Sequence, residues 1–313
     1  MNRFHKKHIL DMASLSVDEI ELILNTATAL KEISERPIKK VPTLRGKSIV
    51  HFFHEPSTRT RTSFEIAAKR MSADTFSISA STSSMTKGET LLDTVTNLQA
   101  MNPDIIVMRH SVSGAPHFVA KHLNASVINA GDGMHAHPTQ CLLDLMTAKE
   151  AVGKIKGLKL SIIGDIFHSR VARSNIVGFV KMGATVTVAG PCTMIPPGID
   201  SLGAQVTHSL EEAISGADII MTLRIQKERQ NNFFFPSERE YASLFGLSYD
   251  RLKAMNKNAF IMHPGPINRG VELSSDVADC PESLILKQVA NGVAIRMALI
   301  YLLMGGTRDA HSN

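Results

Sequence analysis

Short apolar runs alternate with amphipathic segments along most of this chain. The runs are rich in isoleucine and valine and span residues 48–53, 104–108, 126–129, 158–163, 184–189, 218–223 and 259–262. Their apolarity is continuous rather than alternating, which is typical of strands covered on both faces. The segments between them carry polar turns and apolar residues at helical spacing. This alternation predicts an α/β fold whose strands form parallel sheets flanked by helices.

Helix signals stand at both ends of the chain. Ser16 and Glu19 form a capping-box pattern, and apolar residues at helical spacing follow them. A last apolar helix is expected over 284–304. It is too long to be a mere tail, so it should pack back on another part of the protein.

The chain divides best at 149–157, a polar, glycine-punctuated segment that follows a predicted helix. We therefore expect one domain over 1–148 and a second over 149–283. The C-terminal helix within 284–313 is expected to pack back on the first domain. A length of 313 residues is comfortable for two domains of this size.

Composition narrows the class of protein. Hydrophobic residues make up 43% of the chain and charged residues 20%, but no run of 18 apolar residues predicts a membrane span. The basic N-terminus has no apolar run behind it, so it does not resemble a secretory signal. The three scattered cysteines suggest neither a disulfide framework nor a metal cluster. A reducing cytoplasm is the expected location.

The net charge of +5 and the pI near 9.1 favour anionic partners, either nucleic acids or small molecules. Aromatic residues are only 5% of the chain and tryptophan is absent, which argues against a platform for stacking bases. A pocket for small anions is the better prediction.

Polar turns follow the predicted strands. Ligands of open parallel sheets bind beyond the carboxyl ends of the strands, so these turns are candidate site segments. We expect them to face one crevice between the two domains and to form the active site there. They span residues 54–61, 109–110, 131–140, 164–170, 224–229 and 263–266.

The turn at Ser57–Thr60 has the chemistry of an anion site. Apolar residues from Phe64 onward mark one face of a helix, so this turn should lie at the helix N-terminus. Free backbone N–H groups and the helix dipole favour a phosphate there, and hydroxyls and an arginine add further donors. The plainer alternative is that Ser57 is only an N-cap and Arg59 only a solvated side chain.

The polar turns also raise alternative functions: a metal site, a dinucleotide site or a hydrolase site. His135 and His137 could instead form a metal pair completed by Asp132 or His263. Gly164-Asp165 after a strand suggests a dinucleotide site, but the Gly-x-Gly-x-x-Gly pattern is absent. A Gly-x-Ser-x-Gly hydrolase elbow is absent as well.

Several motifs in order resemble the aspartate/ornithine carbamoyltransferase family. Ser57-Thr58-Arg59-Thr60-Arg61, followed by Ser63-Phe64-Glu65, is similar to that family's carbamoyl-phosphate signature. The motifs at 83–90, 137–140, 224–229 and 263–266 follow in the order typical of the family. Gly265 departs from relatives that carry a bulky residue there, so a side-chain contact would be lost while the main-chain role survives.

Two positions resemble the aspartate branch of the family. Ornithine enzymes typically carry cysteine where this chain has Thr139, and Ser-Met-Gly where it has Arg224-Ile225-Gln226. Arginine also suits a carboxylate-bearing acceptor, because its guanidinium grips a carboxylate bidentately. The resemblance thus implies transfer of a carbamoyl group from carbamoyl phosphate to the amine of aspartate, an early step of pyrimidine biosynthesis. The alternatives are another acceptor amine such as ornithine, or a non-catalytic anion-binding protein.

The resemblance implies a role for each site residue. The phosphate would be held by Ser57, Thr58, Arg59, Thr60 and Arg109. The carbonyl oxygen would accept hydrogen bonds from Thr60, Arg109 and His137. The carbamoyl NH2 would meet Gln140 and the main chain at Pro264 and Gly265. The carboxylates of aspartate would meet Lys87, Arg170, Arg224 and Gln226.

The resemblance also implies an assembly and excludes some partners. A homotrimer is expected, in which Ser83 and Lys87 reach the site from a neighbouring subunit. It implies no metal, no organic cofactor, no nucleic acid and no membrane partner, and it leaves a regulatory chain open as a further partner.

Overall fold

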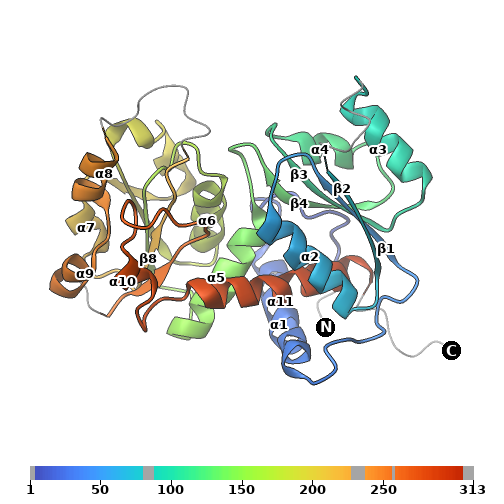
Figure 1. Ribbon diagram of the computed structural model, residues 1–313, viewed down its shortest axis with the longest axis horizontal. Coiled ribbons are helices and arrows are strands. Elements are labelled where there is room, and N and C mark those ends of the chain that lie inside the picture. Colours follow the sequence, from blue (N-terminus) through green and yellow to red (C-terminus); the bar gives the residue numbers. More distant parts are fainter. Residues whose placement is uncertain (1–3, 80–87, 227–236, 256–257, 306–313) are drawn as a thin grey trace. The chain divides into compact units, whose positions relative to one another are not determined.

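The computed structural model describes residues 4–79, 88–226, 237–255 and 258–305 (Figure 1). The chain forms two compact units. Unit 1 comprises the chain up to Leu142 together with the part from Ala290 onward, and unit 2 runs from Leu143 to Val289. Each unit contains one parallel sheet, which confirms the predicted class of two α/β domains.

Unit 1 holds a four-stranded sheet in the order β2-β1-β3-β4. Every pair in it is parallel, with Ser48 opposite Asp74 and Ile105 opposite Ser126. Its strands are β1 (Ser48–Phe53), β2 (Asp74–Ser79), β3 (Ile105–His110) and β4 (Ser126–Asp132). Its helices include α1 (Val17–Lys31), η1 (Glu32–Glu35), α2 (Thr58–Arg70), α3 (Leu91–Ala100) and α4 (Ala115–Ala120). Val95, Leu98 and Val119 bring α3 and α4 onto one buried face of this sheet.

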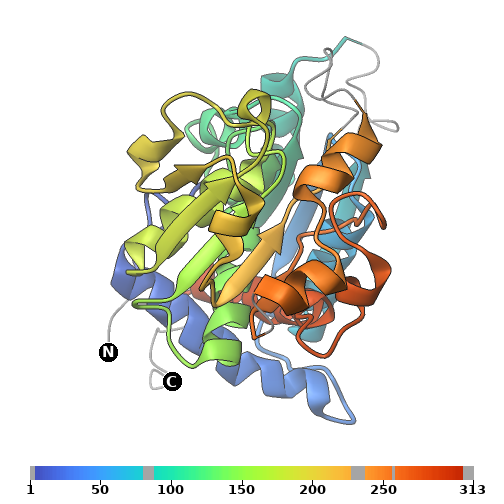
Figure 2. The same cartoon turned by 90° about the vertical axis from the view of Figure 1, so that its left-hand side faces the viewer.

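Unit 2 holds a five-stranded parallel sheet in the order β7-β6-β5-β8-β9. Figure 2 turns this unit toward the viewer. Its strands are β5 (Lys159–Ile163), β6 (Thr185–Ala189), β7 (Gln205–Thr207), β8 (Ile219–Thr222) and β9 (Phe260–Met262). Its helices include α6 (Arg170–Lys181), η4 (Cys192–Met194), η5 (Ile199–Leu202), α7 (Leu210–Ile214), α8 (Glu238–Phe245), α9 (Tyr249–Met255) and α10 (Ser275–Ala278).

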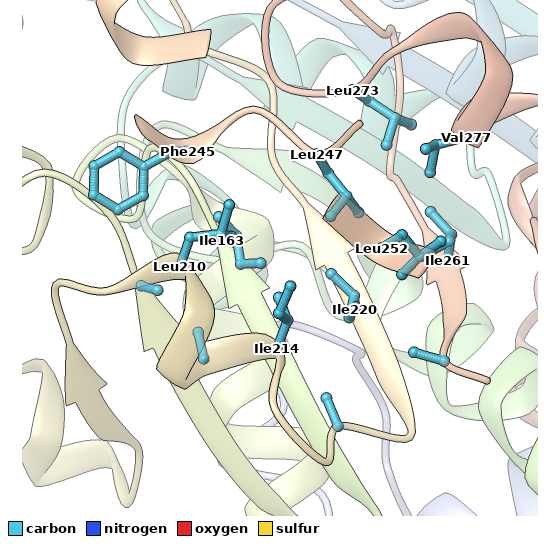
Figure 3. Close-up of a cluster of buried hydrophobic side chains, with 14 of the residues drawn as sticks. Ile163, Leu210, Ile214, Ile220, Phe245, Leu247, Leu252, Ile261, Leu273 and Val277 are labelled. Carbon is cyan, nitrogen blue, oxygen red and sulfur yellow. The ribbon is translucent and has the colours of Figure 1, made fainter. Parts of the chain in front are cut away.

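The core of unit 2 lies between its sheet and the helices α7 to α10 (Figure 3). Ile163, Ile220 and Ile261 come from three neighbouring strands. Leu210 and Leu252 pack against them from helices far apart in the sequence. This packing fixes the strand ends from which the site residues of this unit emerge.

Every apolar run predicted as a strand forms one, but the prediction missed β2 and β7. Both are edge strands, since each pairs with a single neighbour. An edge strand does not need apolar residues on both faces. β2 reads Asp-Thr-Phe-Ser-Ile-Ser, and the first two residues of β7, Gln205 and Val206, are exposed.

Two helices span both units. The units divide within α5 (Pro138–Val152), between Leu142 and Leu143, and within α11 (Ile285–Leu303), between Val289 and Ala290. In unit 1, Arg296 of α11 donates to the Ser63 hydroxyl at 2.8 Å. Its guanidinium lies 5.0 Å from the centre of the Phe64 ring. The later part of α11 therefore packs on α2.

Helix ends follow the sequence signals. The capping box at Ser16 is present, with Glu19 N–H donating to the Ser16 hydroxyl at 3.1 Å and Ser16 N–H donating to the Glu19 carboxylate at 2.9 Å. Among the described helices, α11 alone is long and apolar enough to cross a membrane, but 61% of its apolar window is buried within the protein. That degree of burial is typical of a core helix.

Candidate active site

The turn predicted to bind an anion lies at the start of α2, as the sequence indicated. The helix begins at Thr58, and Ser57 is its N-cap. The Ser57 hydroxyl makes no capping hydrogen bond, and no acidic residue lies in the first turn. Thr58 and Arg59 are exposed, whereas Thr60 is buried. The first N–H groups of a helix have no partner within it, so this turn offers donors to an incoming anion.

Arg109 lies at the end of β3 beside the end of β1. Phe53 and Arg109 are register partners, and His54 N–H donates to the Arg109 carbonyl at 2.8 Å. The Arg109 guanidinium is 2.7 Å from the Glu55 carboxylate, and only 12% of the side chain is exposed. The sequence alone does not reveal this pairing, because nothing in it shows that β1 and β3 are neighbours. Glu55 therefore holds the Arg109 guanidinium in place.

Two stacked imidazoles lie beside this arginine. The rings of His54 and His110 are 4.4 Å apart and nearly parallel, at 21°. His110 Nδ1 accepts a hydrogen bond from Val112 N–H at 3.0 Å, which assigns its proton to Nε2. Burial lowers the pKa of His110 and the neighbouring His54 lowers it further, although Asp132 and Glu55 oppose the shift. A neutral His110 therefore adds no charge beside the anion site.

His137 lies between β4 and α5 and is buried. Its Nδ1 is 3.4 Å from the Thr139 hydroxyl, and its carbonyl accepts from Gln140 N–H at 3.0 Å. The preceding turn depends on Gly133, which has a φ of +43°. A β-carbon there would collide with the backbone of Ser111 and Ser113, so only glycine allows this close approach.

In unit 2, the candidate residues gather at the ends of β5 and β8, which are neighbours. Gly164 ends β5 with a φ of +129°, and a β-carbon there would lie 2.8 Å from the Leu223 carbonyl oxygen. The two strand ends thus approach closely. Arg224 and Gln226 follow β8, while Arg170 is the first residue of α6 and is 5% exposed.

A buried carboxylate organises these strand ends. Asp165 is fully buried and accepts from the backbone N–H of His168 at 3.1 Å. The His168 imidazole Nδ1 is 2.9 Å from the same carboxylate oxygen. Gln226 N–H donates to the other oxygen at 3.5 Å. In the sequence, Asp165 stood out only as part of a rejected dinucleotide signal. In the structure it ties the segment between β5 and α6 to the segment after β8.

A second buried pair holds the turn after β9. His263 Nε2 lies 3.3 Å from the Glu272 carboxylate, and both side chains are buried. His263 Nδ1 accepts from Gly265 N–H at 2.7 Å, and Asn268 N–H donates to Glu272 at 2.6 Å. Both ends of the loop that carries Pro264 and Gly265 are therefore fixed.

The structure brings most of the predicted residues together within each unit. In unit 1 they lie at the ends of the neighbouring strands β1, β3 and β4, and in unit 2 at the ends of the neighbouring strands β5, β8 and β9. Ser83 and Lys87 lie outside the described residues, as do Lys227, Glu228 and Arg229. Among the described residues, the group close enough to hold a metal ion includes Asp132 and His135 but not His137.

Two family models match the chain over almost its whole length. "Aspartate/ornithine carbamoyltransferase, carbamoyl-P binding domain" covers residues 7–150, and "Aspartate/ornithine carbamoyltransferase, Asp/Orn binding domain" covers residues 156–303. The chain belongs to the aspartate/ornithine carbamoyltransferase family. The resemblance found in the motifs is confirmed.

Curated members of the family include relatives of high identity. The aspartate carbamoyltransferase catalytic subunit of Desulforapulum autotrophicum is 65% identical over 308 residues, which cover 98% of this chain and 99% of that protein. The aspartate carbamoyltransferase catalytic subunit of Desulfosudis oleivorans is 64% identical over 304 residues, covering 97% of this chain and 98% of that protein.

Solved structures of the family include both acceptor types. The ornithine carbamoyltransferase of Pyrococcus furiosus has a TM-score of 0.86 at 29% identity and covers 98% of this chain and 100% of its own. The aspartate transcarbamoylase of Trypanosoma cruzi, in complex with carbamoyl phosphate and aspartate, has a TM-score of 0.86 at 27% identity, covering 95% and 97%. At this similarity the family fold alone does not separate the two acceptors.

Proposed function

We propose that this chain transfers the carbamoyl group of carbamoyl phosphate to the amine of L-aspartate, giving N-carbamoyl-L-aspartate and phosphate for pyrimidine biosynthesis. The observation that carries the acceptor is the 65% identity over 98% of the chain to an aspartate carbamoyltransferase catalytic subunit. The side chains at the ends of β5 and β8 support it, because Arg170 and Arg224 suit a carboxylate-bearing acceptor.

Carbamoyl phosphate is assigned to the domain over 1–148 together with the C-terminal helix. The phosphate would accept from the first N–H groups of α2, from the hydroxyls of Ser57, Thr58 and Thr60, and from Arg59. Some N–H groups of the Arg109 guanidinium would donate to the phosphate in place of Glu55. A site with so many donors matches a dianion without needing a metal to neutralise it.

The carbonyl oxygen is assigned to Thr60, Arg109 and His137. Donors aimed at this oxygen stabilise the negative charge that grows on it as the amine attacks. The buried setting of His137 strengthens such a hydrogen bond, because little water competes for it. Gln140 and the main chain at Pro264 and Gly265 would hold the carbamoyl NH2.

Aspartate is assigned to the domain over 149–283. Arg170, Arg224 and Gln226 would hold its two carboxylates and leave its amine free to react. The amine lone pair attacks the carbonyl carbon, a C–N bond forms, and the bond from that carbon to the phosphate oxygen breaks. The departing phosphate takes the proton that the amine loses, so the step requires no protein nucleophile.

The proposed assembly is a cytoplasmic homotrimer in which Ser83 and Lys87 complete the site of a neighbouring subunit. A head-to-tail contact that closes on itself gives such a ring. Arg59→Ala and Lys87→Ala should each be nearly inactive. Dissociated and reassembled together, they should regain up to roughly a third of wild-type activity in the most favourable hybrid trimers. Hybrids, verified by mass, that stay as inactive as their parents would refute shared sites.

The function is tested by mixing the protein with carbamoyl phosphate and either L-aspartate or L-ornithine. Release of phosphate and formation of carbamoyl-aspartate with aspartate alone is the expected outcome. Turnover with ornithine instead would reassign the acceptor. No phosphate release with either amine would favour a non-catalytic anion-binding protein.

A further inference from the structure

Three side chains in unit 1 form a cluster that contains none of the proposed substrate residues. His117 belongs to α4, Asp132 ends β4, and His135 follows in the turn before α5. One possible ligand atom from each lies within 4.8 Å of the other two. His135 Nδ1 is 2.9 Å from the Asp132 carboxylate, and the two imidazole rings are 5.3 Å apart in an edge arrangement. We call this group the His117 cluster.

The carboxylate of this cluster is fixed before any ligand arrives. Asp132 is fully buried and accepts from the Asn129 amide at 2.8 Å, from Gly114 N–H at 2.6 Å and from Ala136 N–H at 3.0 Å. A charged, immobile carboxylate is a good metal ligand because it loses little entropy on binding.

His117 carries a buried nitrogen that lacks a hydrogen-bond partner. Its Nε2 lies 2.7 Å from the Asp11 carboxylate, while its Nδ1 is buried and, among the described residues, has no partner. An Nε2–H that donates to Asp11 leaves a lone pair on Nδ1. Burying such an acceptor without a partner is unfavourable, because it has lost its hydrogen bond to water. A cation bonded to Nδ1 would remove that cost.

Asp11 completes an arrangement typical of metal sites. A histidine that binds a metal usually donates its other ring N–H to a carboxylate, which fixes the ring and raises its basicity. Asp11 is itself held, because it accepts from Ser14 N–H at 2.7 Å. The order carboxylate, histidine, metal is therefore available at His117.

We propose that the His117 cluster binds a divalent transition-metal ion, with Zn²⁺ the best match. Two imidazole nitrogens and one carboxylate oxygen suit Zn²⁺, and water would fill the fourth position. The side chains of His117 and His135 are 33% and 43% exposed, so the ion can enter from solvent. Ligand atoms around tetrahedral zinc lie roughly 3.3 Å apart, so the ion would draw together three atoms that now lie within 4.8 Å of one another.

The ion would join three parts of unit 1: the N-terminal segment through Asp11, the start of α4, and the turn after β4. It would be structural, because none of its ligands is among the proposed substrate-binding residues. This proposal is independent of the proposed carbamoyl transfer, none of whose steps uses the ion.

The test uses untagged full-length protein, stripped with a chelator and then freed of it. Zn²⁺ is titrated against a competing colorimetric chelator, and thermal unfolding is followed in parallel. We expect one Zn²⁺ per chain with a dissociation constant of about 10 μM or tighter, and a rise in melting temperature. Co²⁺ at the same site should give visible absorption bands typical of a tetrahedral ion.

Variants locate the site. His117→Asn and His135→Gln should each weaken Zn²⁺ binding at least about 100-fold and abolish the cobalt bands, and Asp11→Asn should weaken it about 10- to 100-fold. His122→Asn is the matched control. The side chain of this exposed histidine, next to α4, hydrogen-bonds only the Phe118 carbonyl among the described residues. Because His135 is half-exposed, its variant should fold even if the His117 variant does not. No saturable binding, or binding that survives both histidine variants, would overturn the proposal.

Discussion

Helices α2 and α6 start in similar ways, but only in α6 does the N-cap serine make a capping hydrogen bond. Each follows the first strand of its unit, has a serine N-cap, and carries an arginine in its first turn. The hydroxyl of Ser169 accepts from Ala172 N–H at 3.0 Å and is buried. The hydroxyl of Ser57 makes no such bond. The first turn of α6 is thus capped by its own serine, whereas that of α2 has no such side-chain cap.

This difference separates two ways of binding an anion. In unit 1, the proposed phosphate site would use backbone donors and the helix dipole, which are fixed by the fold. In unit 2, the helix start offers less, so the proposed binding of carboxylates would depend on arginine side chains. The buried Asp165 holds the backbone of His168 and Gln226 in the same region. Substitutions in unit 1 should therefore affect carbamoyl phosphate and the chemical step, and those in unit 2 should affect aspartate.

The largest effect is expected for His137→Ala in unit 1. Loss of a donor to the carbonyl oxygen should lower turnover about 10²- to 10³-fold, the usual result of removing one oxyanion donor. Steady-state kinetics at saturating substrates measure it. His122→Ala, which removes an exposed histidine of the same unit, should leave turnover unchanged. Equal turnover in both variants would exclude His137 from the chemistry.

The next effect is a loss of stability at low pH, which should differ between the buried histidines of the two units. His168 and His263 in unit 2 lie against carboxylates. His51 in β1 is fully buried, and neither ring nitrogen has a hydrogen-bond partner among the described residues. Burial lowers its pKa from 6.5 to about 4, with Arg61 and Lys69 adding to the shift and Glu65 opposing it.

A lowered histidine pKa means that the unfolded chain binds the proton more readily. The contribution to stability is complete above pH 6.5 and is lost as the pH falls toward 4, by up to roughly 3 kcal/mol. In His51→Leu, the free energy of unfolding should fall less over this window. Denaturant titrations at several pH values measure it. An unchanged pH slope in the variant would contradict the assignment to His51.

Arg224→Ala in unit 2 should weaken binding rather than turnover. A charge-assisted hydrogen bond to a carboxylate contributes about 1.5–3 kcal/mol, so the KM for aspartate should rise at least about tenfold. The KM for carbamoyl phosphate should change little. Arg239→Ala removes an exposed arginine of α8 and serves as the control. A normal aspartate response in the Arg224 variant would remove this residue from the acceptor site.

The sequence predicted the interior of each sheet better than its edges. Runs such as 48–53 and 158–163 are apolar throughout because both faces of a central strand are covered. β2 and β7 lack that requirement, and Phe76 of β2 is 57% exposed. Their polar composition resembles that of a loop, and only the pairing partner makes them strands.

Within the site, residues fixed by local signals were easier to predict than residues fixed by long-range contacts. The start of α2 follows from adjacent residues, so Ser57 could be placed from the sequence. The bond between Arg109 and Glu55 joins residues 54 positions apart on neighbouring strands. Asp165 meets Gln226 across 61 positions. Both contacts depend on the order of the strands in the sheet, and no local sequence pattern encodes that order.

The smallest effects should come from the two N-cap serines, and they test the comparison of α2 and α6 directly. Ser169→Ala removes a capping bond, so it should lower the free energy of unfolding by about 1 kcal/mol. Its KM for carbamoyl phosphate should match the wild type. Ser57→Ala removes a hydroxyl that caps nothing, so stability should stay unchanged while the KM for carbamoyl phosphate rises about fivefold, from loss of one hydrogen bond. Denaturant unfolding and kinetics on both variants give four values. If Ser57→Ala instead destabilises the protein and binds carbamoyl phosphate normally, its hydroxyl is a cap in solution and α2 is closed in the same way as α6.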